Sequence, residues 1–174
     1  MKSIRVTKYD PKNRDANGHY ILVDEWTSIS DVGRSYEGQV FTMEQYRTIE
    51  EKYIQAVEVL IRKTGTTHLK LLSLENHSNE TDLDLAEGKI IPRRLAKEVV
   101  RMILREKVWG KLIVKNQFEI HFGYDYYMYF AGESLTDDII EELRTIDGLY
   151  VKRCNLLTLI NEGKVPSSKQ RMLL

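Results

Sequence analysis

Apolar and polar residues alternate strictly along one stretch in the C-terminal half of the chain. Every second residue from Phe118 to Phe130 is apolar or aromatic. A period of two puts these side chains on one face of a β-strand and the intervening side chains on the other face. The alternation is already present at Leu112 and Val114, so the pattern predicts an antiparallel meander.

The alternation also limits the turns of this meander, because residues paired across a turn must share a face. A three-residue turn at residues 115–117 pairs Val114 with Phe118. A second three-residue turn, at residues 123–125, would pair Phe122 with Tyr126, Ile120 with Met128 and Phe118 with Phe130. One long bent strand is the alternative to this second turn.

A different period, close to 3.6 residues, follows Thr42. Its apolar residues recur at spacings of three and four, and they are Tyr46, Ile49, Tyr53, Val57, Leu60 and Ile61. Thr42 and Gln45 fit a capping box, in which the threonine hydroxyl accepts a backbone N–H and the glutamine reaches back. Gly65 can adopt the left-handed conformation that ends a helix. The spacing therefore predicts a helix that begins at Thr42 and closes at residues 63–65.

Weaker patterns predict the remaining elements. Pro92 suits the first turn of a second helix, which the apolar spacing carries to the neighbourhood of Gly110. Thr136 precedes two acidic residues and predicts the start of a third helix, which stops at Gly148. Short strands are expected at residues 3–9, 19–26, 67–74 and 149–151, and a short apolar helix at residues 155–161.

Together these elements indicate the α+β class, with a mainly antiparallel sheet that includes the C-terminal meander and is packed by two to three helices. A chain of 174 residues fits one domain. We expect that domain over residues 1–163 and a loose tail over residues 164–174.

Composition narrows the class of protein. The formal charges balance, with 26 Lys and Arg against 26 Asp and Glu, whereas dedicated nucleic-acid-binding domains are usually basic. No apolar run reaches the roughly 18 residues that a membrane helix needs, and no secretory signal follows Lys2. One cysteine forms no internal disulfide, which favours a reducing compartment. We therefore expect a cytoplasmic protein with no nucleic-acid or membrane partner.

The balanced total hides a segregation of charge along the chain. Residues 71–88 contain five acidic residues and no basic one, and residues 133–147 contain six acidic residues and one arginine. Residues 89–107, between them, contain seven basic and two acidic residues. Such runs are usually solvated faces. If the two acidic stretches lie together, however, they would attract a basic protein partner.

The sequence offers few candidates for catalysis. No histidine has a metal-ligand spacing with another histidine or with the cysteine, so we expect no metal and no cofactor. His121 and Asp125 share a face in the alternation, where they could form an acid–base pair or simply a hydrogen-bonded histidine. Asp24, Glu25 and Asp31 could be paired catalytic carboxylates. Acids so close in sequence are more often solvated or capping residues.

Tyrosine dominates the aromatic residues, with ten Tyr against four Phe and two Trp. A tyrosine ring is favoured where one end must meet water or a partner, which is why it is enriched at interfaces. Half-buried tyrosines on strands are the alternative interpretation.

Two stretches carry distinctive motifs. The first is Asp24-Glu25-Trp26-Thr27-Ser28-Ile29-Ser30-Asp31-Val32-Gly33, followed by the helix from Tyr46 to Tyr53. The second is Phe118-Glu119-Ile120-His121-Phe122-Gly123-Tyr124-Asp125-Tyr126-Tyr127-Met128-Tyr129. Both resemble segments of small cytoplasmic bacterial immunity proteins that are paired with polymorphic or contact-dependent toxins. The resemblance covers residues 1–151, and residues 152–174 depart from the short ending of that family.

The resemblance implies a non-enzymatic protein that binds a cognate toxin C-terminal domain and occludes its active site. Tyr and Trp would act as anchors, and carboxylates would pair with toxin Lys or Arg. The candidate contact residues are Asp24, Glu25, Trp26, Ser30, Asp31, Tyr124, Asp125, Tyr126 and Tyr127. Two alternatives are a small enzyme that uses the His121/Asp125/Tyr cluster and a homodimeric scaffold; the oligomeric state is left open.

Overall fold

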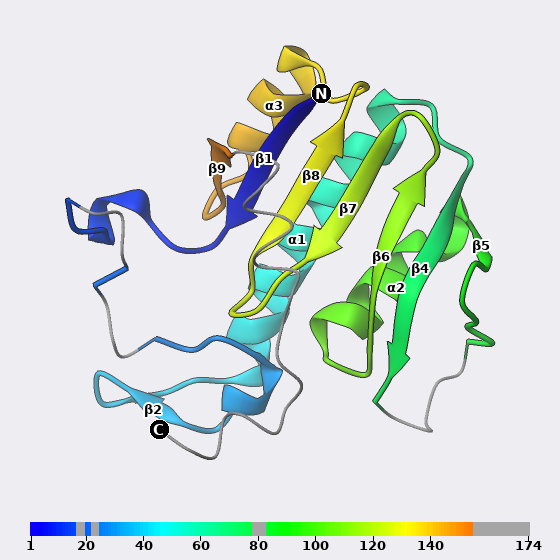
Figure 1. The fold of residues 1–174 in the computed structure, drawn as a ribbon. Coiled ribbons are helices and arrows are strands. Elements are labelled where there is room, and N and C mark those ends of the chain that lie inside the picture. The colour runs from blue at the N-terminus through cyan, green and yellow to red at the C-terminus, as the bar shows by residue number, and fades with distance from the viewer. Residues whose placement is uncertain (17–19, 22–24, 78–82, 155–174) are drawn as a thin grey trace.

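A seven-stranded antiparallel sheet forms the centre of the molecule, in the order β5-β4-β6-β7-β8-β1-β9 (Figure 1). The computed structural model describes residues 1–16, 20–21, 25–77 and 83–154. The strands are β1 (Lys2–Thr7), β2 (Ser35–Tyr36), β3 (Gln39–Val40), β4 (His68–Asn76), β5 (Ile90–Pro92), β6 (Val108–Val114), β7 (Phe118–Phe122), β8 (Met128–Gly132) and β9 (Tyr150–Arg153). The helices are α1 (Met43–Lys63), α2 (Arg93–Leu104) and α3 (Asp137–Arg144), with 3₁₀ turns η1 (Pro11–Asn13) and η2 (Ile29–Asp31). This architecture confirms the predicted α+β class.

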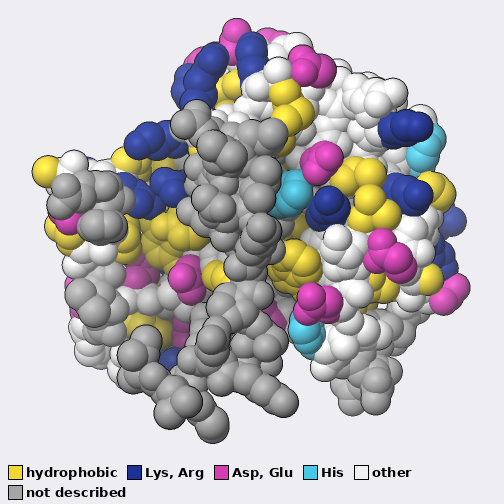
Figure 2. All heavy atoms as spheres, in the orientation of Figure 1, with side chains coloured by type: hydrophobic (Ala, Val, Ile, Leu, Met, Phe, Trp, Pro, Cys, Tyr) yellow, Lys and Arg dark blue, Asp and Glu magenta, His cyan; other side chains and the backbone are white. Residues whose placement is uncertain are grey.

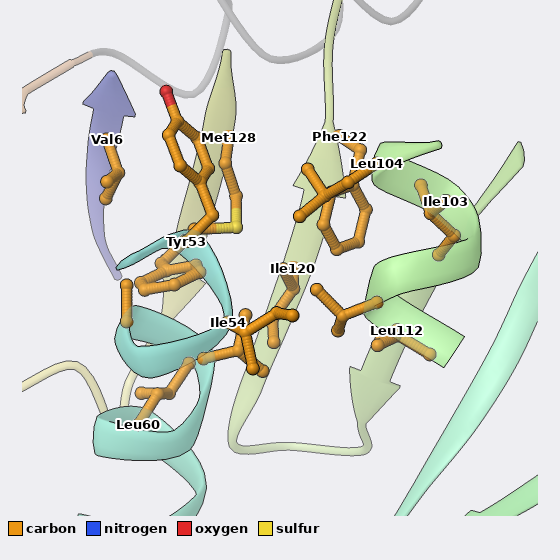
Figure 3. Close-up of a cluster of buried hydrophobic side chains, with 14 of the residues drawn as sticks. Val6, Tyr53, Ile54, Leu60, Ile103, Leu104, Leu112, Ile120, Phe122 and Met128 are labelled. Carbon is orange, nitrogen blue, oxygen red and sulfur yellow. The ribbon is translucent and has the colours of Figure 1, made fainter. Parts of the chain in front are cut away.

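The three helices lie on one face of the sheet, and the main core fills the space between them (Figure 1). Figure 3 shows side chains from β1, α1, α2 and the meander pointing into the same interior, among them Tyr53 and Ile120. The strand alternation explains this arrangement, since alternate residues of β7 are buried and face the helices. On the opposite face, Lys, Arg, Asp, Glu and His side chains are interspersed with hydrophobic ones (Figure 2).

The predicted cap of α1 is confirmed. The Thr42 hydroxyl accepts the Gln45 N–H at 3.2 Å, and the Gln45 side chain accepts the Thr42 N–H at 2.8 Å. These two bonds satisfy backbone donors that a helix start would otherwise leave open. The helix then runs to Lys63 and provides eight buried side chains to the hydrophobic core.

The meander forms as predicted, with one change of register. The turn at residues 115–117 gives the expected pairs Val114–Phe118 and Leu112–Ile120. The second turn is longer than predicted, because Phe122 pairs with Met128, Ile120 with Phe130 and Phe118 with Gly132. A shift of two residues keeps every side chain on its face, so the alternation alone does not select between the two registers.

The predicted end of the second helix was wrong. α2 ends at Leu104, and Gly110 lies within strand β6. Glu106 adopts a left-handed backbone with φ 58°, and the Lys107 N–H bonds to the Met102 carbonyl. These features close the helix before β6 begins, although the apolar spacing continues across the boundary.

Several smaller expectations have mixed outcomes. Residues 3–9, 67–74 and 149–151 correspond to β1, β4 and β9. Pro92 ends the short strand β5, which the sequence did not indicate, and serves as the N-cap of α2. The predicted strand at residues 19–26 lies partly outside the described residues, and its described positions contain only an isolated bridge from Tyr20 to Arg14. The predicted helix at 155–161 and the tail at 164–174 lie outside the described residues.

The two acidic stretches lie at opposite edges of the sheet, one around β4 and β5 and the other around α3 and β9. Several charges of the second stretch are used within the chain, since Asp137 pairs with Lys2 and Arg153, and Asp138 pairs with Lys63. The described residues of the two stretches therefore form no joint acidic face. No helix among the described residues is long and apolar enough to cross a membrane.

Candidate functional site

The two motifs found in the sequence meet at one end of the sheet. The ring of Trp26, from the first motif, packs edge-on against Tyr126 of the second, with centroids 5.1 Å apart. We call the surrounding rings the aromatic cluster, which consists of Tyr9, Tyr20, Trp26, Phe41, Tyr46, Tyr53, Tyr126 and Tyr127. Phe41 of the cluster lies between β3 and α1, and Tyr46 lies near the beginning of α1.

The β7–β8 loop, residues 123–127, turns one tyrosine inward and its neighbour outward. Asp125 and Tyr126 both adopt left-handed backbone conformations, with φ 52° and 62°. The Gly123 N–H bonds to the Tyr127 carbonyl at 2.7 Å and closes the loop. Tyr126 is 6% exposed and Tyr124 is 48% exposed, and Asp125 is also exposed. The loop thus uses Tyr126 as an internal anchor and presents Tyr124 and Asp125 on the surface.

Tyr53 ties this loop to strand β1. Its buried hydroxyl accepts the Lys8 N–H at 2.8 Å and donates to the Tyr126 carbonyl at 2.6 Å. Its ring also packs against Tyr126, with centroids 5.0 Å apart. One helical side chain therefore fixes the backbone of two segments that are far apart in sequence. Burial raises the pKa of the Tyr53 phenol, which keeps the donating proton in place.

Lys8 lies inside the aromatic cluster, with 3% of its side chain exposed. Its Nζ is 4.0 Å from the Tyr9 ring centroid and 4.1 Å from that of Trp26. It donates to Glu25 Oε1 at 2.5 Å, and the Tyr20 hydroxyl donates to Glu25 Oε2. A buried ammonium needs such partners, because its desolvation costs several kcal/mol. The ion pair with Glu25 and the contact with the Trp26 ring therefore hold the first motif against the segment that directly follows β1.

The charge of Lys8 has a consequence for stability at alkaline pH. Burial lowers the pKa of the Lys8 ammonium to about 8, although Glu25 acts in the opposite direction. Above pH 8 the unfolded chain holds this proton more strongly than the folded chain, so folding becomes more favourable as pH rises. Relative to a Lys8→Met variant, wild type should gain about 2 kcal/mol of unfolding free energy between pH 7 and pH 9.5.

Urea unfolding of both proteins across this pH range measures the difference. Because other tyrosines and lysines titrate in both proteins, only the difference between the two profiles reports Lys8. Parallel profiles would contradict the lowered pKa.

Asp31 and Ser30 have structural partners around η2. Asp31 is 5% exposed, and its Oδ2 accepts the Thr27 N–H at 2.7 Å and the Ser28 N–H at 3.2 Å. Its other oxygen pairs with Arg34 at 2.7 Å. Ser30 is exposed and bonds to Ser28. Asp31 therefore serves as a capping residue, and the backbone donors and Arg34 hold its carboxyl pKa below the ordinary value despite burial.

The other described contact residues that the sequence predicts are half-buried. Tyr127 is half-buried, accepts a hydrogen bond from Arg14 at 3.0 Å and lies beneath the Arg5 guanidinium. Glu25 and Trp26 are also partly exposed. Asp24 lies outside the described residues.

The histidine of the catalytic interpretation has a carboxylate partner on its own strand. His121 Nε2 lies 2.8 Å from Glu119 Oε2 on the sheet surface, which gives the histidine a neighbouring carboxylate partner. Among the described residues, no group of His, Cys, Asp and Glu is arranged to hold a metal ion. Cys154 packs beside Tyr129 and Ala131, and burial raises the pKa of its thiol. A raised thiol pKa disfavours the reactive thiolate.

Sequence reasoning missed Tyr9, Tyr20 and Phe41 as members of the cluster and Lys8 as the charge inside it. Lys8 and Tyr9 directly follow β1, where no period continues, and nothing local marks a lysine as buried. The only available signal was the excess of tyrosine over phenylalanine, which indicates many rings with a hydroxyl to satisfy.

No protein-family model, no curated protein and no solved structure matches the chain. The fold and the aromatic cluster are therefore the basis for any functional assignment.

Proposed function

We propose that the chain is a non-enzymatic immunity-type protein that binds a cognate bacterial toxin domain and occludes its active site. The observation that carries this proposal is the contact between the two motifs, since Trp26 packs against Tyr126. Segments about a hundred residues apart are thereby held side by side at one end of the sheet. Their exposed side chains would form the binding surface, which would act in the cytoplasm of the cell that makes the toxin.

The outer part of this surface suits protein recognition. Tyr124 and Asp125 project from the β7–β8 loop, and Ser30 is exposed on η2. Tyrosine supplies a large contact area with little conformational freedom to lose, and an adjacent carboxylate suits a Lys or Arg of the toxin.

The inner part would hold the surface ready for binding. Tyr126, Asp31 and Lys8 are buried, and they hold the loop, η2 and the first motif in place through the contacts described above. A surface that is already ordered loses less entropy on binding. In this proposal the buried candidates Tyr126 and Asp31 act by positioning, and Tyr124 and Asp125 touch the toxin.

The direct test is co-expression of the chain with the toxin encoded by the adjacent upstream gene. We expect the chain to restore growth and to form a complex with the toxin domain that survives purification. If no neighbouring gene product binds the chain, the proposal is wrong. Light scattering of the chain alone tests the homodimer alternative, because a concentration-independent monomer excludes it.

The contact residues are tested by Tyr124→Ala, which removes the exposed anchor and leaves Tyr126 in place. We expect its affinity for the toxin domain to fall roughly 30-fold, as for an interface hot spot of about 2 kcal/mol. Titration calorimetry measures the affinity. Ile90→Ala is the matched control, since Ile90 is 53% exposed on β5, far from the loop in the sheet order. Equal affinities of the two variants would contradict the assignment of the surface.

A further inference from the structure

A small apolar patch lies on the face of the sheet opposite the three helices. Met128 and Phe130 of β8 belong to the main core, and the residues that alternate with them face the other way. This second cluster of packed side chains, which we call the outer patch, consists of Tyr127, Tyr129, Ala131 and Cys154.

Two residues of the outer patch are more deeply buried than their place on the sheet explains. Tyr129 is 2% exposed and Ala131 is 3% exposed. In the register of the sheet Tyr129 lies between His121 and Arg5, so side chains of the neighbouring strands cover the sides of its ring. No described helix lies on this side of the sheet (Figure 1), and the open face of an antiparallel sheet ordinarily meets water. Burial this complete requires a cover over the patch.

The outer patch also contains buried hydrogen-bond donors that lack acceptors. The Tyr129 hydroxyl and the Nε of the adjacent Arg5 are buried, and neither has a hydrogen-bond partner among the described residues. Buried polar groups of folded proteins are normally paired. The cover is therefore expected to bring an acceptor oxygen as well as apolar side chains.

The chain itself leads from the outer patch into residues 155–174. Cys154 is held to β1 by two hydrogen bonds, since its N–H donates to the Ser3 carbonyl at 3.1 Å and its carbonyl accepts from the Ser3 hydroxyl at 2.6 Å. Its side chain belongs to the patch. The residues that follow are thereby tethered beside the patch, at an effective concentration that a separate molecule rarely reaches.

The composition of the next seven residues matches what the patch requires. The spacing of the apolar residues within 155–161 is that of one face of a helix, and they are Leu156, Leu157, Leu159 and Ile160. Asn155 and Asn161 would flank this face, and each carries an amide oxygen that can accept a hydrogen bond.

We propose that residues 155–161 cover the outer patch as a short helix with its apolar face against Tyr129 and Ala131. An amide oxygen at the edge of that face would accept the hydrogen bond of the Tyr129 hydroxyl. The patch is then a docking site for the chain's own C-terminal segment and is closed to other partners. This inference does not depend on the proposed function, because toxin recognition is assigned to the Tyr124 surface.

The test is NMR of the isotope-labelled full chain. We expect nuclear Overhauser contacts between the Tyr129 ring and the methyl groups of residues 156–160. An isotope-filtered spectrum of mixed labelled and unlabelled chains, which reports only contacts between copies, should contain none of them. Absence of the contacts in the first spectrum would overturn the proposal. Their presence in the filtered spectrum would identify a second copy as the occupant and overturn it as well.

A matched pair of variants tests the apolar face. Leu156→Asp/Ile160→Asp should shift the resonances of Tyr129 and Ala131, and should lower the midpoint of thermal unfolding by roughly 5 °C, because two apolar side chains lose their packing. Thr158→Asp/Ser167→Asp changes the net charge equally and alters polar residues of the same segment. It should leave the resonances and the midpoint as in wild type. Equal changes in the two variants would contradict the proposed face.

Discussion

Replacing Tyr126 by alanine is expected to lower the free energy of unfolding by about 3–5 kcal/mol, the range for removing a fully packed aromatic side chain. The ring contacts Trp26, Tyr46 and Tyr53, with centroids 5.0 to 5.8 Å away. Each contact adds to the burial itself. Urea unfolding measures the loss, and the midpoint of thermal unfolding should fall by roughly 10 °C.

Tyr124→Ala is the control for this result, because it removes the same side chain two residues earlier in the same loop. Tyr124 is 48% exposed, so the free energy of unfolding should change by no more than about 0.5 kcal/mol. The two variants therefore separate positioning from contact: Tyr126→Ala should lose stability and toxin binding together, and Tyr124→Ala only binding. A stable Tyr126→Ala protein would contradict the anchor role.

Glu50→Ala is the second variant with a large expected effect, a loss of about 3 kcal/mol of unfolding free energy. Glu50 is 1% exposed and accepts two hydrogen bonds from Arg105, at 2.7 and 2.8 Å, with Arg101 nearby. Removing the carboxylate leaves guanidinium groups at the α1–α2 contact without their buried partner. Since both arginines are about a quarter exposed, they reach water in part, and the loss lies at the lower end of the range for broken buried pairs.

Glu51→Ala provides the comparison on the adjacent residue. Glu51 also pairs with α2, through Lys97 and Arg101, but half of its side chain is exposed. Exposed pairs contribute about 0.2–1 kcal/mol. Denaturation curves should therefore differ strongly between the two variants, and similar curves would mean that burial does not set the strength of these pairs.

Much of the fold was predictable because it depends on local patterns. The alternation after Lys111 identified the meander, and the Thr42–Gln45 capping box located the start of α1 to the residue. Both signals arise from residues that are close together in the sequence. They can therefore be recognised without knowledge of the tertiary structure.

The wrong predictions concern the length of a turn and the end of a helix, which local sequence patterns do not determine. The predicted second turn of the meander was two residues too short, and Tyr126 was therefore assigned to a strand pair. The alternation could not reveal this error, because a two-residue shift leaves every side chain on the same face. The actual role of Tyr126 as an anchor depends on Trp26 and Tyr53, which approach from distant segments. The end of α2 was placed too late for a similar reason, because apolar residues of the helix and of β6 follow one another without a break.

The sequence singled out the two motifs whose residues lie together in the structure, but it did not indicate how their side chains are arranged. The two motifs contained the residues that meet, but the division into buried anchors and exposed contacts required the backbone of the loop. Lys8 was not foreseen, since burial of this lysine depends on Glu25 and Trp26, which come from another segment. The sequence also did not show what the segregated charges contact, and several of the described acidic residues pair with basic residues of other elements.

The first strand of the chain is an interior strand of the sheet, between β8 and β9. Both of its partners come from residues 128–153, so β1 has no neighbour until almost all of the described chain has been synthesised. During synthesis, β1 leaves the ribosome well before β8 and β9, so its backbone groups stay unpaired until those two strands have followed. Strand pairing over such a distance is slow, and the unpaired edge is prone to aggregation in the interval. A chain that stops before β8 would have no complete sheet to support the aromatic cluster.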